Sequence, residues 1–184
     1  YYPEGHPLRD QEAVEIRYMT AKDEDILTSK TLLLKGLAIE RFLQGILVDK
    51  TINVNDLYVG DKNAILIAAR ITGYGESYDI KATCPSCGHV NKNVFDLETL
   101  EPYYGDDLDD NMQLTDDGTF LITLPVSQVN LEVRLMTSKD EDYLIRLAEN
   151  KRKKNLPESN LTDQLTRMIV SVNGDNNHAS ISRF

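Results

Sequence analysis

The sequence contains no tryptophan, only two cysteines and only three histidines among its 184 residues. Two cysteines are too few for the disulfide framework of a small secreted protein, which indicates a reducing compartment of origin. A transmembrane helix needs a run of about 18 or more apolar residues. The longest apolar runs, at residues 32–34 and 64–69, are far shorter. These absences exclude a disulfide-stapled domain and predict that no segment spans a membrane.

Basic residues are also in short supply. Twenty Lys and Arg stand against 30 Asp and Glu, which gives a formal net charge of −10. A surface that binds DNA or RNA needs clustered lysine and arginine, so we expect no nucleic-acid partner. We interpret the only dense basic run, residues 151–154, as a solvated loop. The acidic surface instead suits basic neighbouring proteins, whose docking it would steer.

Motifs of catalysis are missing as well. The sequence has no P-loop, no glycine-rich dinucleotide motif, no nucleophile elbow and no paired-histidine zinc motif. The three histidines are scattered through the chain, at His6, His89 and His178. We therefore predict that the protein is not an enzyme, with no catalytic residues and no residues that bind an organic cofactor.

An internal repeat organises the chain. Residues 14–27 align without gaps with residues 131–144, and nine of the fourteen positions are identical. Self-similarity of this strength indicates a duplicated structural unit. In both copies an apolar/polar alternation comes first, at residues 14–18 and 131–135, as in a half-buried strand.

A capped helix is expected after each of these strands. Thr20 and Thr137 are good N-cap residues, and Asp23 and Asp140 follow three residues later, which resembles a capping box. The acidic cluster also favours the positive end of a helix dipole. We interpret the shared KDED segment as this helix start and not as a metal or phosphate site, because adjacent helical residues point in different directions.

More weakly, the repeat continues into amphipathic helices. Apolar residues at helical spacing occupy residues 39–47 in the first copy and 161–172 in the second, where Asn173 and Gly174 would end the helix. The second copy is about six residues longer between the matched segments, which a loop around residues 151–157 can absorb. In the first copy a further helix is predicted over residues 61–71.

The chemistry-bearing candidate is Cys84-Pro-Ser-Cys87-Gly-His89, in the turn between two predicted strands, residues 78–83 and 90–97. Two thiolates at this spacing fit two corners of a zinc tetrahedron, and the glycine after the second cysteine permits a tight turn. Cys84 and Cys87 are thus candidate zinc ligands, with His89 a weaker candidate. Three outcomes stay open: a second cysteine pair completes the site, a histidine or neighbouring subunit completes it, or the turn holds no metal.

These observations predict an α+β protein of two related strand–capped-helix units, the first carrying a zinc-ribbon-like β-hairpin. The first unit would span residues 1–100, an acidic connector residues 101–118, and the second unit residues 119–184. Within the connector, Asp116, Asp117 and Gly118 predict a hairpin turn. We expect the chain to continue past both ends shown. If the duplication is complete, a second Cys-x-x-Cys should lie roughly twenty residues beyond Phe184.

The order of these motifs resembles a known family. The run of MT-x-KDED, AARITGYG, YDIKATCPSCGHVNKNVFDL and VRLMTSKDED is similar to the baseplate hub proteins of T4-like contractile-tailed bacteriophages, including the hub-assembly subunit, whose members carry one or more Cys-x-x-Cys knuckles. The resemblance covers residues 12–184, and the second knuckle of the family is absent from this sequence.

The resemblance implies a structural role in the virion, in the hub region of the tail baseplate, through contacts with other tail proteins. It further implies synthesis in the host cytoplasm and several copies in a symmetric assembly. Two alternatives stay open. The protein could be an assembly chaperone that is absent from the mature particle, or a zinc-ribbon adaptor module.

Overall fold

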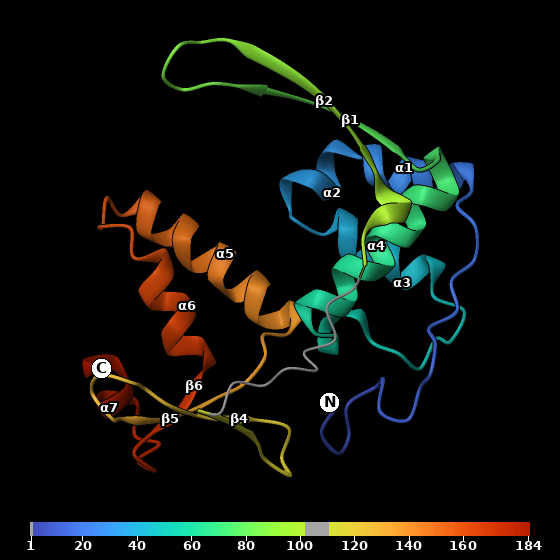
Figure 1. Cartoon of the computed structure of the whole chain (residues 1–184). Coiled ribbons are helices and arrows are strands. Elements are labelled where there is room, and N and C mark those ends of the chain that lie inside the picture. The colour runs from blue at the N-terminus through green and yellow to red at the C-terminus, as the bar shows by residue number, and fades with distance from the viewer. Residues whose placement is uncertain (1, 102–110) are drawn as a thin grey trace. The chain divides into compact units, whose positions relative to one another are not determined.

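A computed structural model gives the structure of residues 2–101 and 111–184 (Figure 1). These residues form seven α-helices and two antiparallel sheets, of two and four strands. The predicted α+β class is therefore confirmed. No helix within the described ranges is long and apolar enough to cross a membrane.

The chain folds as two compact units. What we call the terminal unit comprises the described residues of Tyr1–Glu12, Thr51–Val59 and Gly105–Phe184, and what we call the inserted unit comprises those of Ala13–Lys50 and Gly60–Tyr104. The first copy of the repeat lies in the inserted unit and the second copy in the terminal unit. The boundaries proposed from the sequence, after residues 100 and 118, stay a prediction.

The inserted unit is built on helices α1 (Ala21–Thr28), α2 (Lys30–Leu34), α3 (Ala38–Ile46) and α4 (Val59–Tyr74), the last from Gly60 onward. Helix α3 is strongly amphipathic, as its apolar spacing predicts. Its apolar stripe and α4 form the core of this unit, in which the buried apolar residues are Ala38, Phe42, Leu43, Ile46, Leu47, Ile65 and Ala69.

The terminal unit is a four-stranded sheet with three helices. In chain order its elements are β3 (Met112–Leu114), β4 (Phe120–Thr123), β5 (Asn130–Val133), α5 (Ser138–Lys153), α6 (Asn160–Met168), β6 (Ile169–Val172) and α7 (His178–Arg183). The strands are ordered β3-β4-β5-β6. The buried apolar residues of the unit are Leu8, Ile52, Val54, Leu57 and Leu131.

The repeat is visible in the backbone of both units. In the first copy the Arg17 N–H donates to the Ile46 carbonyl at 2.9 Å, and in the second the Arg134 N–H donates to the Met168 carbonyl at 2.9 Å. The antiparallel bridge between Ile16 and Leu47 in the first copy corresponds to the pairing of β5 with β6 in the second. The spans from Arg to acceptor are 29 and 34 residues (46 − 17 and 168 − 134), so the second copy is five residues longer.

Two predicted elements differ from the structure because of how their ends pair. Residues 14–18 form a single bridge, between Ile16 and Leu47, and not the predicted strand; the Val48 N–H donates to the Glu15 carbonyl beside it. The helix predicted over residues 161–172 ends at Met168, and Ile169–Val172 is strand β6. Its β-branched residues favour a strand, which pairs with β5.

The basic run and the connector also differ. Lys151, Arg152 and Lys153 are the last turn of α5 and not a loop, because cations stabilise the negative end of a helix dipole. Of the predicted acidic connector, residues 102–110 lie outside the described residues. Its last part contains strand β3 (Met112–Leu114), which the predicted turn at Gly118 folds against β4.

Candidate functional site

The cysteines lie at the end of a two-stranded arm. Strands β1 (Ser77–Thr83) and β2 (Val90–Asp96) pair antiparallel from Ser77↔Asp96 to Thr83↔Val90, as the sequence predicts. Every residue of the two strands is exposed except the half-buried Ile80. Figure 1 shows this hairpin extending away from the helices of the inserted unit. We call residues 77–96 the hairpin arm.

The base of the arm is fixed to α4. The Arg70 guanidinium donates to the carbonyls of Gly75 at 2.8 Å and Ser77 at 3.0 Å. It also lies over the rings of Tyr74 and Tyr78, at 5.1 and 5.7 Å from their centroids, in cation–π contacts. The arm therefore projects from an anchored base.

Two backbone hydrogen bonds hold the turn at the tip. The Cys84 N–H donates to the His89 carbonyl at 2.8 Å, and the Gly88 N–H donates to the Cys84 carbonyl at 2.9 Å. Gly88 has φ +72°, a left-handed conformation that a side chain would strain. The two cysteines are free thiols whose side chains lie 3.6 Å apart.

Hydrogen bonds at the tip favour the ionised form of one thiol. The backbone N–H groups of Cys87 and Ser86, together with the Cys87 side chain, lower the pKa of Cys84 below its ordinary value. Thiolates are the form of cysteine that binds metals. The lowered pKa favours the thiolate form of Cys84.

The tip alone does not form a complete zinc ribbon. His89 is exposed, and within the ranges described no three His, Cys, Asp or Glu side chains gather closely enough to hold a metal ion. A structural zinc site needs four ligands. The structure brings together Cys84 and Cys87 but does not support the predicted zinc-ribbon character of the hairpin.

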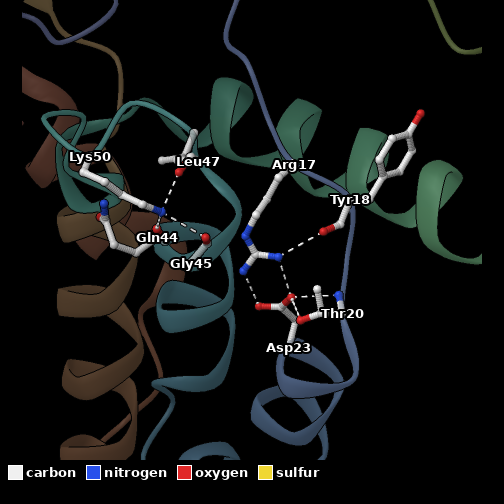
Figure 2. Close-up of polar contacts among 8 residues, drawn as sticks. All are labelled: Arg17, Tyr18, Thr20, Asp23, Gln44, Gly45, Leu47 and Lys50. Atoms are coloured by element: carbon white, nitrogen blue, oxygen red, sulfur yellow. Dashed lines mark hydrogen bonds and ion pairs between the residues drawn. The ribbon is translucent and has the colours of Figure 1, made fainter.

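In each copy of the repeat a buried carboxylate accepts an ion pair from a partly exposed arginine, and Figure 2 shows the first. The Asp23 carboxylate, 2% exposed, receives Arg17 Nη1 at 2.7 Å and Nη2 at 2.8 Å. The Thr20 N–H and hydroxyl donate to the same carboxylate at 2.8 and 2.7 Å. The predicted capping box is therefore present, and a guanidinium fork completes it.

The second copy repeats these bonds around Asp140, which is also 2% exposed. Arg134 forks onto its carboxylate at 2.6 and 2.9 Å, and the Thr137 N–H and hydroxyl each donate at 3.0 Å. A second guanidinium is added here, because Arg167 Nε of α6 donates to Asp140 Oδ1 at 2.6 Å. Asp140 thus has one more cationic partner than the equivalent Asp23 of the first copy.

Glycine takes the place of that arginine in the first copy. Counting back from the matched acceptors Ile46 and Met168, Gly45 corresponds to Arg167. A Cβ at Gly45 would lie 3.5 Å from Asp23 Oδ1, so this position faces the carboxylate. Figure 2 shows Lys50 nearby, whose Nζ donates to the Gln44, Gly45 and Leu47 carbonyls and caps α3.

These carboxylates should make the fold acid-sensitive. The Arg17 fork holds the pKa of Asp23 well below its ordinary value. Burial would raise the pKa of Asp140, but hydrogen bonds from Arg134, Thr137 and Arg167 outweigh it and hold that pKa well below its ordinary value. Since the unfolded chain takes up protons first, the stabilisation is present above about pH 4 and is lost as the pH falls.

We expect the free energy of unfolding in urea to decrease as the pH falls from about 5 to about 2. The double variant Asp23→Asn/Asp140→Asn should be less stable at neutral pH and should lose less stability in acid. Asp25→Asn, at an exposed position two residues from Asp23, is the matched control and should keep the wild-type slope. A double variant with the full wild-type slope would contradict this assignment.

Beside the arm's base, the inserted unit has an apolar cavity of about 430 Å³. The hydroxyl of Tyr74, one of the residues that line the cavity, donates to the Glu24 carboxylate, a contact that raises the pKa of Tyr74. The cavity is lined by Met19, Leu27, Ile39, Phe42, Leu66, Ile67, Arg70, Tyr74, Tyr78 and Leu97.

Comparison with known proteins identifies the family. The family described as T4 bacteriophage base plate protein matches residues 6–121, more than half of the 184-residue chain. This range includes the first copy of the repeat and the whole hairpin arm. No curated protein and no solved structure matches the chain. The match agrees with the resemblance seen in the order of the sequence motifs, and the chain belongs to the T4 bacteriophage base plate protein family.

Proposed function

We propose that the protein is a structural subunit of the hub region of a contractile phage tail baseplate, present in several copies and acting through protein–protein contacts. Membership of the baseplate family supports the baseplate role and a place in the virion tail among other tail proteins. It also favours a structural role over a catalytic one. The hub region and the copy number are the finer part of the proposal.

The hairpin arm is the observation that carries the proposed mode of action. An isolated two-stranded hairpin is marginally stable in water and usually needs further strands or a helix against it. Here both strands expose nearly every residue, including the large apolar side chains of Tyr78, Val90, Val94 and Phe95. An arm of this kind is suited to attach the subunit to a neighbour. Its strand edges can pair with a strand of the neighbour, and its apolar side chains can pack against it.

Shortening the arm tests this attachment. Replacement of residues 80–93 by Asn-Gly keeps the anchored base and closes a tight hairpin turn. Because those residues are exposed or half-buried, we expect the purified variant to keep the helical circular dichroism and unfolding midpoint of the wild type. Phage encoding this variant should nevertheless yield no infectious particles. Normal titres from the shortened arm would overturn the attachment role.

An assembly chaperone is the competing role, and quantitative mass spectrometry of purified particles separates the two. A structural subunit should be found in finished particles at a fixed ratio to the other baseplate proteins. A chaperone should be needed for assembly and yet be missing from the particles. The second alternative, an adaptor acting through a complete zinc ribbon, would require two ligands beyond the pair in the described residues.

A further inference from the structure

We propose that the tip of the hairpin arm is one half of a tetrahedral zinc-type metal site, and that the tip of a second copy of the chain supplies the other two ligands. The ligands would be Cys84 and Cys87 of each copy. This inference goes beyond the proposed baseplate role and does not depend on it, because it concerns the isolated chain.

The spacing of the two cysteines fits one metal ion. Two sulfur atoms bound to a tetrahedral zinc at about 2.3 Å are about 3.8 Å apart. The side chains of Cys84 and Cys87 are 3.6 Å apart, with both thiols free. The backbone hydrogen bonds from Cys84 to His89 and from Gly88 to Cys84 hold the turn in this shape. The pair is therefore arranged for chelation before any metal arrives.

The other two ligands must come from outside the tip. No third His, Cys, Asp or Glu of the ranges described stands with the pair, and the whole turn is exposed or half-buried. Exposure of the tip leaves room for another tip to approach. A two-fold axis through the metal would bring together two identical pairs, which is the self-complementary geometry of most homodimers.

Charge on the arm favours a negative centre at its tip. The two acids of the arm, Asp79 and Asp96, lie toward its base, and the residues beyond them, 80–93, contain two lysines and no Asp or Glu, in a chain of net charge −10. Lys81 and Lys92 lie directly opposite each other in the β1–β2 register. Like charges in this position destabilise a hairpin. Zinc bound by four thiolates carries a net charge of −2. Two arms would bring four lysines toward this centre. The negative centre would offset the repulsion between Lys81 and Lys92, and the lysines would offset its charge.

The test is a titration of the reduced, metal-free 184-residue chain with Co²⁺ and Zn²⁺. We expect the visible bands of tetrahedral cobalt, with thiolate-to-metal charge transfer, to saturate at one Co²⁺ per two chains. Sedimentation should show a dimer with Zn²⁺ and a monomer after chelation. Cys84→Ser and Cys87→Ser should each lose the cobalt bands and the dimer. Ser86→Ala and His89→Ala, in the same turn, should keep both.

Three results would overturn the proposal. One is saturation at one metal ion per monomeric chain, which would place all ligands within one copy. Another is the absence of binding at stoichiometric cobalt, and the third is a dimer that chelation and the cysteine variants leave intact. None of these readouts depends on baseplate assembly, so failure here and failure of the proposed function are distinguishable.

Discussion

Replacing Arg17 with methionine should destabilise the protein by about 3 kcal/mol, while the equivalent change at Arg134 should cost only about 1 kcal/mol. The carboxylates they face are equally buried, at 2% exposure. Without Arg17, Asp23 keeps its hydrogen bonds from the N–H and hydroxyl of Thr20 but loses the guanidinium that forks onto its carboxylate. Without Arg134, the Arg167 guanidinium remains 2.6 Å from Asp140.

The expected cost of Arg17→Met follows from leaving the buried Asp23 carboxylate without its arginine partner. Leaving one member of a buried ion pair alone costs about 3–5 kcal/mol. We take the lower end, because the Arg17 side chain is 41% exposed and water already screens this pair. Urea unfolding of the two variants measures the difference directly.

Two further variants make the comparison decisive. Arg134→Met/Arg167→Met should be about as destabilised as Arg17→Met, since it removes every guanidinium from Asp140. Arg41→Met, an exposed arginine of α3, is the matched control and should change stability by less than about 0.5 kcal/mol. Equal losses for Arg17→Met and Arg134→Met would show that the second guanidinium contributes nothing.

Leu43→Ala should destabilise the inserted unit by about 2–5 kcal/mol. Leu43 is completely buried on the apolar stripe of α3, so truncation removes its packing and leaves a cavity in the core. Leu34→Ala makes the same chemical change at a side chain that is 89% exposed, and should cost less than about 0.5 kcal/mol.

Thermal and urea unfolding measure both leucine variants. The contrast rests only on burial, because the deleted atoms are the same. Comparable unfolding midpoints for the two would mean that Leu43 is not part of the core described here.

Local patterns predicted most of the fold. The alternation and turn residues around Cys84 and Cys87 predicted the arm within a residue at each end. Thr20 and Thr137 predicted the helix starts, because an N-cap acts on its own first turn. The pairing of Ile169–Val172 with β5 was missed, since a short apolar run fits a helix or a strand until its partner is known.

The ion pairs were missed for a related reason. Arg17 and Arg134 belong to the repeat, and their identity in both copies was visible in the sequence. In an extended segment, however, such an arginine is also typical of the solvent-facing side of a strand. The contribution of Arg167 could not be predicted at all, because it depends on where α6 comes to lie beside Asp140.

Because the terminal unit is made of three separate chain segments, the two units cannot be completed at the same time during synthesis. The inserted unit has all its residues once the chain has been made to about residue 104, and domains generally fold as units while translation proceeds. The segments Tyr1–Glu12 and Thr51–Val59 belong with strands and helices that are not yet made at that point. Until the rest of the terminal unit has been made, apolar residues of these segments such as Leu8 and Leu57 lack the partners that bury them. During this time host chaperones can bind the two segments.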